Sequence, residues 1–405
     1  MATNKEQNKQ NVPHLRFPEF HGEWEKCKLG DIATLTKGSG ISKDQRSATG
    51  TPCILYGELY TTYKSEVIDY VVSKTDISDK NLVRSCANDI IIPSSGETAI
   101  DISTARCVLS PDVLLGGDLN IIRLKDGDGR FFSYQLNGVR KHDIAKIAQG
   151  VSVVHLYGES IKGLTVSFPS NKEQQKISTL LSLIDERIAT QNKLIEDLKK
   201  LMSAIIENVF DDKHSKRLQL DNVGSYIRGL TYSSNDVVEH GGTLVMRSNN
   251  IVNGSLLDYN NNVVFVNKQM SAEQQLQNGD IVICMANGSS SLVGKSSFYD
   301  GNWHSPITVG AFCGIYRSKE PIVKWLFQTN KYRRYIWNSL QGGNGAIANL
   351  NGEDILNMSF SIPNAPIKDT CVKMLTSVDS ALENNISLCA LYTLQKQHLL
   401  RQMFI

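Results

Sequence analysis

A heptad repeat of apolar residues runs through residues 174–210 and constrains the fold more than any other feature. Its ten positions follow one another at alternating steps of four and three, and nine are apolar: Ile177, Leu181, Ile184, Ile188, Gln191, Ile195, Leu198, Met202, Ile205 and Val209. This spacing predicts one long helix with a hydrophobic seam. At ~1.5 Å per residue the stretch is roughly 55 Å long, so its seam needs a partner of similar length.

The same seam recurs near the end of the chain, in the alignment that places Phe210 on Phe404. Its positions are Cys371, Leu375, Val378, Leu382, Asn385, Cys389, Tyr392, Lys396, Leu399 and Met403. The polar residue of the first seam, Gln191, aligns on Asn385. We therefore expect the two helices to form an antiparallel pair, with Gln191 and Asn385 close together at mid-length, where a buried polar pair fixes the register.

The segments that precede the two helices also match each other. KLGDIATLTKG at 28–38 aligns on QLDNVGSYIRG at 219–229, and ANDIIIPSSGE from residue 87 aligns on NGDIVICMANG from residue 278. Closer to the helices, HLYGESI at 155–161 aligns on NLNGEDI at 349–355. The chain therefore repeats one plan, in which a strand-rich domain is followed by a heptad helix.

This plan predicts an α+β fold: two similar strand-rich α/β domains in tandem, and two long helices that form an antiparallel coiled coil, in a pseudo-two-fold repeat. The predicted parts are a flexible N-terminal tail at 1–14, a first domain at 15–169, a first long helix at 170–212, a second domain at 213–363 and a second long helix at 364–405. In the first domain we expect strands at 53–56, 67–72, 90–92, 107–109 and 120–124, and then a helical piece at 131–147.

Composition argues against several classes of protein. The chain has 405 residues and a net charge of only +2, so bulk positive charge is too small to coat phosphates by itself. None of the eight cysteines stands at a zinc spacing, and we expect no metal site. No apolar run approaches ~18 residues, and the start MATNKEQNKQ is polar, so we expect no membrane partner and a cytoplasmic location.

Catalytic motifs are missing as well. The sequence contains neither GxxxxGK followed by Ser or Thr nor a Pro-Pro pair, which the Asp/Asn-Pro-Pro-Tyr/Phe element of adenine methyltransferases requires. The nearest approach to a nuclease core is Pro111-Asp112 with Asp197-Leu198-Lys199, and the second part lies on the heptad helix. We therefore expect no catalytic residue and no cofactor bound by this chain.

Two similar domains held by a long helix pair suit a polymer with two separated sites. A rod of roughly 55 Å matches roughly 16 base pairs of duplex DNA at ~3.4 Å each. The candidate contacts are loop side chains whose hydroxyl, amide, aromatic and basic groups can bind phosphates or base edges. They are Lys37, Lys43, Tyr56, Tyr60, Thr61, Thr62, Tyr63, Lys64, Ser94, Ser95, Glu97, Thr98, Arg228, Tyr232, Arg247, Ser248, Asn249, Asn250, Asn287, Ser289, Ser290 and Lys295. A solvated turn without base contact is the alternative for each loop, and plain surface charge is the alternative for each basic side chain.

Taken together, these features resemble the specificity (S) subunit of type I restriction-modification enzymes. The resemblance covers nearly the whole chain. It is carried by the opening LRFPEFHGEWEKCKLGDI, by Asp89-Ile90 and Gly279-Asp280-Ile281, by GESIKGLTVSFP and GEDILNMSFSIP before the helices, and by the first heptad helix.

The resemblance implies two target-recognition domains, each of which reads one half of an asymmetric bipartite site in double-stranded DNA. It also implies protein partners. Two modification subunits would bind S-adenosylmethionine and methylate adenine N6, and two restriction/translocase subunits would use ATP and Mg²⁺. The chain would itself catalyse nothing. Base-reading residues differ between members of this family, so none is carried over to this sequence.

The second seam departs from an ideal repeat at Tyr392 and Lys396. We expect the helix pair to be looser there, or that face to meet a modification subunit. Two other hypotheses stay open at this point. A self-sufficient DNA methyltransferase or nuclease with a duplicated target domain would act without partners, and a scaffold for two proteins without a nucleic-acid role would also use the helix pair.

Overall fold

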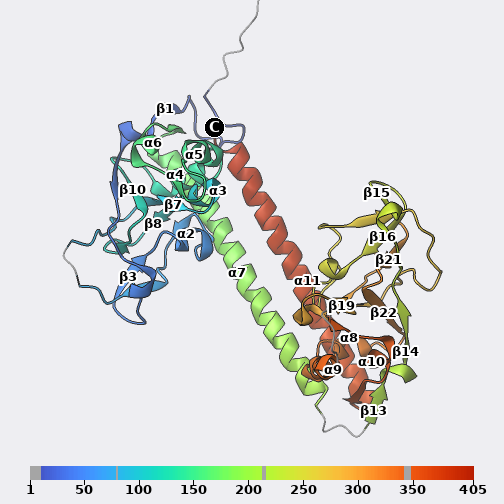
Figure 1. Ribbon diagram of the computed structural model, residues 1–405. Helices are drawn as coiled ribbons and strands as arrows, with labels where there is room; N and C mark the ends of the chain where they lie inside the picture. Colours follow the sequence, from blue (N-terminus) through green and yellow to red (C-terminus); the bar gives the residue numbers. More distant parts are fainter. Residues whose placement is uncertain (1–10, 79–80, 212–215, 342–347) are drawn as a thin grey trace, which may run out of the picture. The chain divides into compact units, whose positions relative to one another are not determined.

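The computed structural model describes residues 11–78, 81–211, 216–341 and 348–405 (Figure 1). The chain divides into two compact units: Met1–Lys193 with Ile386–Ile405, and Leu194–Asn385. Each unit is mixed α/β and takes in about half of each long helix. The units therefore cut across both helices, whereas the division expected from the sequence treats each helix as a separate segment.

The first unit contains a five-stranded sheet, a three-stranded sheet and two pairs of strands. The large sheet has the order β2 (Ala33–Lys37), β10 (Leu119–Leu124), β6 (Asp89–Pro93), β8 (Arg106–Val108) and β4 (Val67–Ile68). The small sheet has the order β5 (Ser73–Thr75), β3 (Thr51–Ile54) and β9 (Leu114–Leu115). The pairs are β1 (Glu25–Lys28) with β12 (Thr165–Phe168), and β7 (Ser95–Gly96) with β11 (Val154–His155).

The second unit repeats this arrangement with two four-stranded sheets and two pairs. One sheet has the order β14 (Gly224–Arg228), β22 (Cys313–Ser318), β18 (Ile281–Cys284) and β20 (Ser296–Phe298). The other has the order β15 (Val237–Val238), β17 (Val264–Val266), β16 (Thr243–Met246) and β21 (Ile307–Val309). The pairs are β13 (Lys216–Gln219) with β24 (Ser359–Ile362), and β19 (Ala286–Asn287) with β23 (Ala348–Asn349).

Short helices connect these strands, and two long helices follow the repeats. The helices of the first repeat are α1 (Leu29–Ile32), α2 (Glu58–Thr61), α3 (Ala99–Ile102), α4 (Gly129–Asn137), α5 (Lys141–Ile147), α6 (Gly158–Lys162) and α7 (Asn171–Val209). Those of the second are α8 (Val323–Leu326), α9 (Asn330–Gln341), α10 (Gly352–Leu356) and α11 (Ala365–Gln402). Single turns of 3₁₀ helix are η1 (Lys43–Gln45), η2 (Leu220–Asn222), η3 (Ser234–Asp236), η4 (Ser248–Asn250) and η5 (Ser290–Leu292).

The repeat predicted from the sequence is confirmed at the level of single elements. In the alignment of the two halves, β2 falls on β14, β7 on β19, β10 on β22 and α6 on α10, and each pair begins and ends at matching residues. The two long helices also start at matching residues, Asn171 and Ala365. The α+β fold class with two similar domains and a coiled coil is therefore as expected.

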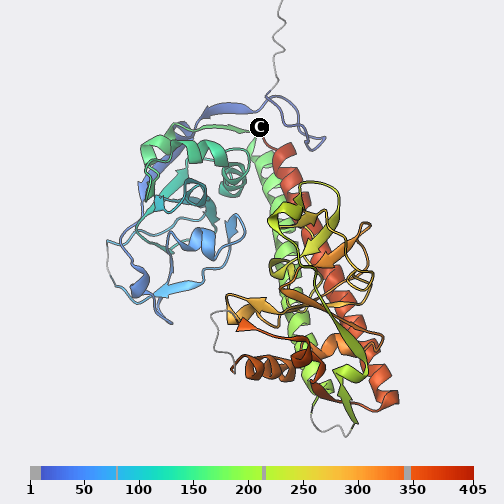
Figure 2. The same cartoon turned by 45° about the vertical axis from the view of Figure 1, so that its right-hand side comes forward.

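The heptad seams are the shielded faces of α7 and α11. All twenty predicted seam positions are buried or half-buried. Within the first unit the helices run antiparallel, because Arg187 lies near Tyr392, with the guanidinium 5.9 Å from the ring centroid, and Asn192 Oδ1 lies 3.4 Å from Cys389 Sγ. Figure 1 and Figure 2 both show the last turns of α11 beside the first half of α7.

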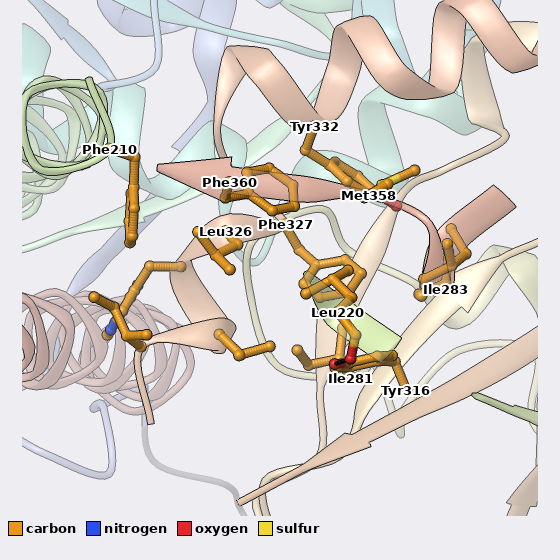
Figure 3. Close-up of a cluster of buried hydrophobic side chains, with 14 of the residues drawn as sticks. Phe210, Leu220, Ile281, Ile283, Tyr316, Leu326, Phe327, Tyr332, Met358 and Phe360 are labelled. Carbon is orange, nitrogen blue, oxygen red and sulfur yellow. Dashed lines mark hydrogen bonds between the residues drawn. The ribbon is translucent and has the colours of Figure 1, made fainter. Parts of the chain in front are cut away.

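The ends of the two helices enter the cores of the repeats. Phe404 packs against both Trp24 and Phe131, with ring centroids 6.4 and 5.1 Å away. Phe210, its counterpart, belongs to the largest buried cluster of the second unit, with Leu326 and Phe360 (Figure 3). Each long helix therefore ends as a core element, which explains why the repeat ends on a phenylalanine in both copies.

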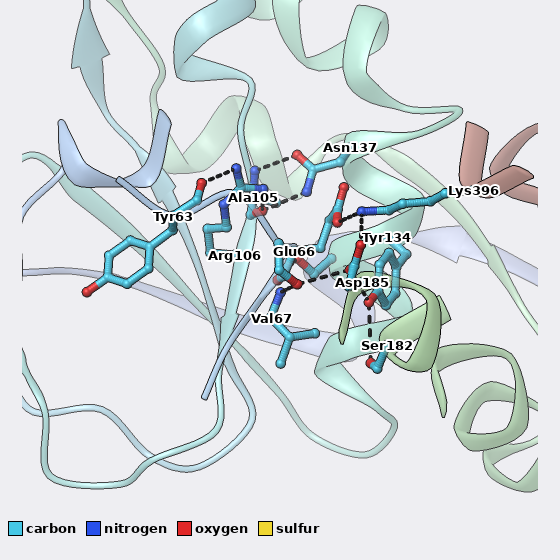
Figure 4. Close-up of polar contacts among 12 residues, drawn as sticks. Tyr63, Glu66, Val67, Ala105, Arg106, Tyr134, Asn137, Ser182, Asp185 and Lys396 are labelled. Atoms are coloured by element: carbon cyan, nitrogen blue, oxygen red, sulfur yellow. Dashed lines mark hydrogen bonds and ion pairs between the residues drawn. The ribbon is translucent and has the colours of Figure 1, made fainter. Parts of the chain in front are cut away.

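An ion network fastens α11 to the first unit (Figure 4). Lys396 Nζ lies 2.5 Å from Asp185 Oδ1 on α7 and forms an ion pair with Glu66. Tyr134 Oη on α4 donates a 2.7 Å hydrogen bond to Asp185 Oδ2. The Lys396 side chain is only 12% exposed. The expectation of a loose helix pair at Lys396 is therefore wrong, because its charge is neutralised by two carboxylates.

Two expected segments lie partly outside the described residues. Of the tail expected at 1–14, residues 1–10 are not described, and Asn11 exchanges hydrogen bonds with the backbone of Trp24 at 2.8 and 2.5 Å. Residues 212–215, at the boundary expected between the first helix and the second domain, are not described either. Among the described residues no helix combines the length and the apolar character that a membrane span needs.

Candidate nucleic-acid interface

A large hollow opens beside β3 in the first unit. Its volume is about 1080 Å³, and four of the predicted contact residues line it: Lys43, Tyr56, Thr61 and Thr62. Lys43 stands on η1, and the other three follow β3, where the chain leaves the small sheet and turns into α2. All four are exposed, so their basic, aromatic and hydroxyl groups are available to a ligand.

A second hollow, of about 470 Å³, opens beside β16 in the second unit. Four predicted contact residues line it as well: Tyr232, Arg247, Ser248 and Asn249. Arg247 Nη2 donates a 2.8 Å hydrogen bond to the carbonyl of Asn262, while its buried Nε has no hydrogen-bond partner among the described residues. The bond to Asn262 therefore holds the guanidinium in place beside the hollow.

The two hollows occupy equivalent places in the two repeats. Tyr56, which follows β3, aligns on Arg247, which follows β16. Gly38 and Gly229 also correspond, and a Cβ atom at either would lie 2.0 or 2.2 Å from the carbonyl oxygen of Gly116 or Gly310. Only glycine permits this close approach of two backbone segments. The glycine that ends each aligned sequence block thus permits close contact with a segment next to a hollow, since Gly117 lines the first hollow and Gly310 lines the second.

A second predicted loop lies close to each hollow. In the first unit a Cβ atom on Gly96 would lie 3.9 Å from Tyr60 Oη, and the pKa of Tyr60 is raised by burial and then by the charges of neighbours that include Glu97. In the second unit Asn287 Nδ2 donates a 3.3 Å hydrogen bond to Ser248 Oγ. The structure therefore brings together loops that lie well apart in the sequence.

A buried carboxylate supports the floor of the first hollow. Glu58 Oε2 accepts a 2.9 Å hydrogen bond from the amide of Leu55, and Oε1 accepts one from Ser73 Oγ. Arg46, a lining residue that sequence reasoning missed, lies 3.6 Å from the same carboxylate. The carboxylate of Glu58 thus partly offsets the positive charge of the hollow. Such a balance suits a surface that must select a partner as well as attract one.

Two predicted contact residues are structural, and the prediction is corrected for them. Tyr63 is 8% exposed, its hydroxyl accepts a hydrogen bond from the amide of Val72, and burial raises its pKa to about 12. Asn250 is fully buried, and its Nδ2 donates to the carbonyls of Asp258 and Asn261 at 3.1 and 2.7 Å. Both side chains are buried, so neither presents a surface to DNA.

Three further candidates are constrained by the fold. Ser94 and Ser95 are buried at 6% and 9% exposure, at the end of β6 and in β7. Thr98 caps α3, since its hydroxyl accepts a 3.1 Å hydrogen bond from the amide of Asp101. Glu97, between them, remains exposed.

The other predicted basic and polar residues lie outside the two hollows. Lys37 and Arg228 are the exposed last residues of the equivalent strands β2 and β14. Lys64 Nζ donates to the carbonyl of Thr61 at 3.2 Å. Ser289 is exposed, with its hydroxyl 2.8 Å from that of Ser291. Ser290 and Lys295 line a smaller hollow of about 270 Å³ with Arg333 and Trp337 of α9, which sequence reasoning did not single out.

The predicted register pair remains a prediction. Gln191 belongs to the first compact unit and Asn385 to the second, and both are half-buried. Asn385 Nδ2 donates a 2.6 Å hydrogen bond to the carbonyl of Ala381 one turn earlier in α11. Among the described residues, no group of three or more His, Cys, Asp and Glu side chains is placed to hold a metal ion.

Comparison with known proteins agrees with the geometry. Residues 21–200 match the family model described as type I restriction modification DNA specificity domain. The type I restriction enzyme EcoKI specificity subunit of Escherichia coli strain K12 is 34% identical over 158 residues, 36% of this chain and 31% of that protein. The MjaVIII specificity subunit of Methanocaldococcus jannaschii is 24% identical over 235 residues, 55% of this chain and 51% of that protein.

The fold is also that of a solved structure. The crystal structure of the type I restriction-modification system S subunit from M. genitalium superposes with a TM-score of 0.66 at 17% identity, covering 97% of this chain and 99% of that one. The matched segments span about a third to a half of the length of the two curated relatives. Residues 21–200 of this chain are therefore similar to the type I restriction modification DNA specificity domain, and the chain is similar to the specificity subunits of type I restriction enzymes.

Proposed function

We propose that this chain is the DNA-specificity subunit of a type I restriction-modification complex, and that each repeat reads one half of an asymmetric bipartite DNA target. The observation that carries the proposal is the duplicated hollow, in which equivalent backbones hold different side chains. A duplicated backbone with different side chains suits two similar duplex segments of different sequence, because phosphate contacts depend on DNA geometry whereas base contacts depend on side-chain chemistry.

The partners in this proposal are double-stranded DNA, two modification subunits and two restriction/translocase subunits, in the cytoplasm. S-adenosylmethionine, ATP and Mg²⁺ belong to those subunits, and this chain catalyses no step. The surface proposed for docking the modification subunits is the outer face of α11, where Leu391 and Leu394 are 60% and 58% exposed and lie outside the heptad seam. Exposed leucines on a helix supply the apolar area that a helical partner buries.

The coiled coil has a role of its own in the proposal. It sets the number of unread base pairs between the two half-sites, because each long helix ends in a core and cannot slide without losing that packing. A slip of one helical turn would shift the helices by ~5.4 Å, which is more than one base-pair step of ~3.4 Å. Because the packing of the helix ends prevents such a slip, we expect the gap to be constant to within about one base pair.

Methylome sequencing tests the proposal directly. Cells that carry the modification subunit would be sequenced with the chain, without it, and with the chain alone. We expect methylated adenine in two short half-sites separated by a constant unread gap, and only when both proteins are present. Methylation or cleavage by the chain alone would favour a self-sufficient enzyme, and one continuous short site would contradict the bipartite mechanism.

A further inference from the structure

One position at the edge of each hollow has the same backbone role in both repeats. Asp118 and Phe312 are the residues immediately before β10 and β22, and each lines its hollow. The carbonyl of Asp118 accepts a 2.7 Å hydrogen bond from the amide of Ser94, and the carbonyl of Phe312 accepts a 2.9 Å bond from the amide of Met285. Ser94 and Met285 themselves correspond in the alignment of the two halves.

The side chains at this shared position differ in every respect that matters for base recognition. Asp118 is exposed and carries a carboxylate, whose Oδ1 has one long contact of 3.4 Å with Ser94 Oγ. Phe312 is an apolar ring that is 67% exposed. A carboxylate is only an acceptor of hydrogen bonds, whereas a phenyl ring offers only apolar contact.

The surroundings of each side chain support a role at a base edge. Asp118 shares its hollow with Lys43, whose charge offsets the repulsion between a carboxylate and DNA phosphates, while Arg46 in the same hollow lies beside Glu58. Phe312 shares its hollow with Arg247 and Asn249, which can donate to guanine and adenine edges. An exposed phenyl ring among such donors is placed to contact the one apolar group in the major groove, the thymine methyl.

We propose that Asp118 and Phe312 are specificity-determining residues of the two half-sites, in which Asp118 accepts a hydrogen bond from a cytosine amino group and Phe312 packs on a thymine methyl. Cytosine suits Asp118 better than adenine does, because the adenine edge presents the N7 acceptor beside its amino group and would repel a carboxylate. This inference rests on the proposed function and adds the chemistry by which the two half-sites become different.

Substitution at the two positions gives the first test, read by methylome sequencing of cells with the modification subunit. Phe312→Ala is expected to relax one thymine position in one half-site, and Phe312→Leu is expected to retain it. Asp118→Gly is expected to relax one cytosine position in the other half-site. Asp118→Asn is expected to shift that position toward adenine, since an amide pairs with adenine N6 and N7. Asn and Gly also tolerate the left-handed backbone of Asp118, with φ of 58°.

Val237→Ala is the matched control, because Val237 is an exposed apolar residue of the second unit, 46% exposed, that does not line the hollow. It is expected to leave both half-sites unchanged. The inference would be overturned if Phe312→Ala and Asp118→Gly directed methylation to the same half-sites, with the same gap, as the parent chain. A second half-site without thymine in either strand, or a first without cytosine, would overturn it as well.

The second test is decided by the parent chain, so it does not depend on whether a variant folds. The complex of the parent chain with its modification subunits is titrated with target duplexes in which deoxyuridine replaces one thymine at a time. Loss of one methyl group is expected to weaken binding about 4-fold at one position of the second half-site, from ~0.8 kcal/mol per buried carbon. The Phe312→Ala complex is expected to be insensitive to the same replacement.

Equal affinity of the parent complex for every deoxyuridine duplex would overturn the assignment of Phe312. This failure is distinct from failure of the proposed function. Absence of any split, chain-dependent methylation site would remove the specificity role itself, whereas a split site that ignores Asp118 and Phe312 would remove only this inference.

Discussion

At the scale of single residues, the repeat preserves buried charge more faithfully than it preserves the loops. Asp89 and Asp280 open the equivalent strand segments and are each 1% exposed. Asp89 accepts two hydrogen bonds from Arg123, at 2.8 and 2.7 Å, and Asp280 accepts two from Arg317, at 2.8 and 2.6 Å. Such two-point pairs hold neighbouring strands in register, so the Asp-Ile elements noticed in the sequence have a structural cause.

Replacement of one of these aspartates gives a prediction at this scale. Asp280→Asn leaves one acceptor oxygen and turns an amide donor toward Arg317, so the second unit is expected to lose roughly 2–3 kcal/mol of stability. Hydrogen exchange of the full chain checks this. We expect faster exchange than in the parent chain in β18 and β22, and an unchanged rate in β6 and β10. Glu239→Gln, at an exposed residue, is the control. Unchanged protection of β18 would contradict the prediction.

The predicted contact residues mark the limit of what sequence can predict at this scale. Tyr56, Arg247 and Asn249 are predicted contacts because of their aromatic, basic and amide groups, and they line the hollows. Tyr63 and Asn250 carry the same chemistry but are buried, and loops have no periodicity that separates inward from outward side chains. Asp118 and Phe312 do not stand out in the sequence, because only the fold brings the residues before β10 and β22 to the hollows.

At the scale of elements, the long helices were the most predictable part of the chain. A period of seven over ten positions fixes the shielded face without knowledge of the partner, and all of these positions are shielded. The helical piece expected at 131–147 is interrupted after Asn137, where α4 ends and α5 begins at Lys141. A lysine at a seam position suggests a defect, and the sequence does not show that Lys396 is paired with Asp185 of α7 and with Glu66 in the loop before β4.

The helix pair therefore yields a prediction about Lys396. Lys396→Met leaves the carboxylates of Glu66 and Asp185 close together without a cation, and is expected to cost about 3 kcal/mol in the first unit. Urea denaturation of the full chain, with hydrogen exchange to locate the loss, measures it. Lys373→Met on the exposed face of the same helix is the control and is expected to change little. If both variants were equally stable, the network would have no structural role.

At the scale of the whole molecule, the internal repeat predicted the fold better than local patterns did. One alignment of the two halves relates strands, hollows and long helices alike, because a duplicated sequence must bury equivalent faces in equivalent ways. Local patterns predicted fewer of the strands. In the small sheet of β5, β3 and β9, only β3 was predicted. The other two strands have three and two residues, which is too few for an alternating pattern to be recognised.

The last prediction concerns the gap between the proposed half-sites. Four residues inserted into α7 after Asn192 add about one helical turn, or ~6 Å, which corresponds to roughly two base pairs. The chain should then direct methylation to the same two half-sites at a longer spacing, because the hollows lie outside the altered segment. Methylome sequencing reads both quantities at once. Four residues inserted between the exposed Gly241 and Gly242 serve as the control and should leave the gap unchanged. A constant gap in the α7 variant would refute the measuring role of the helices, whereas altered half-sites would show that the insertion had disturbed the reading surfaces instead.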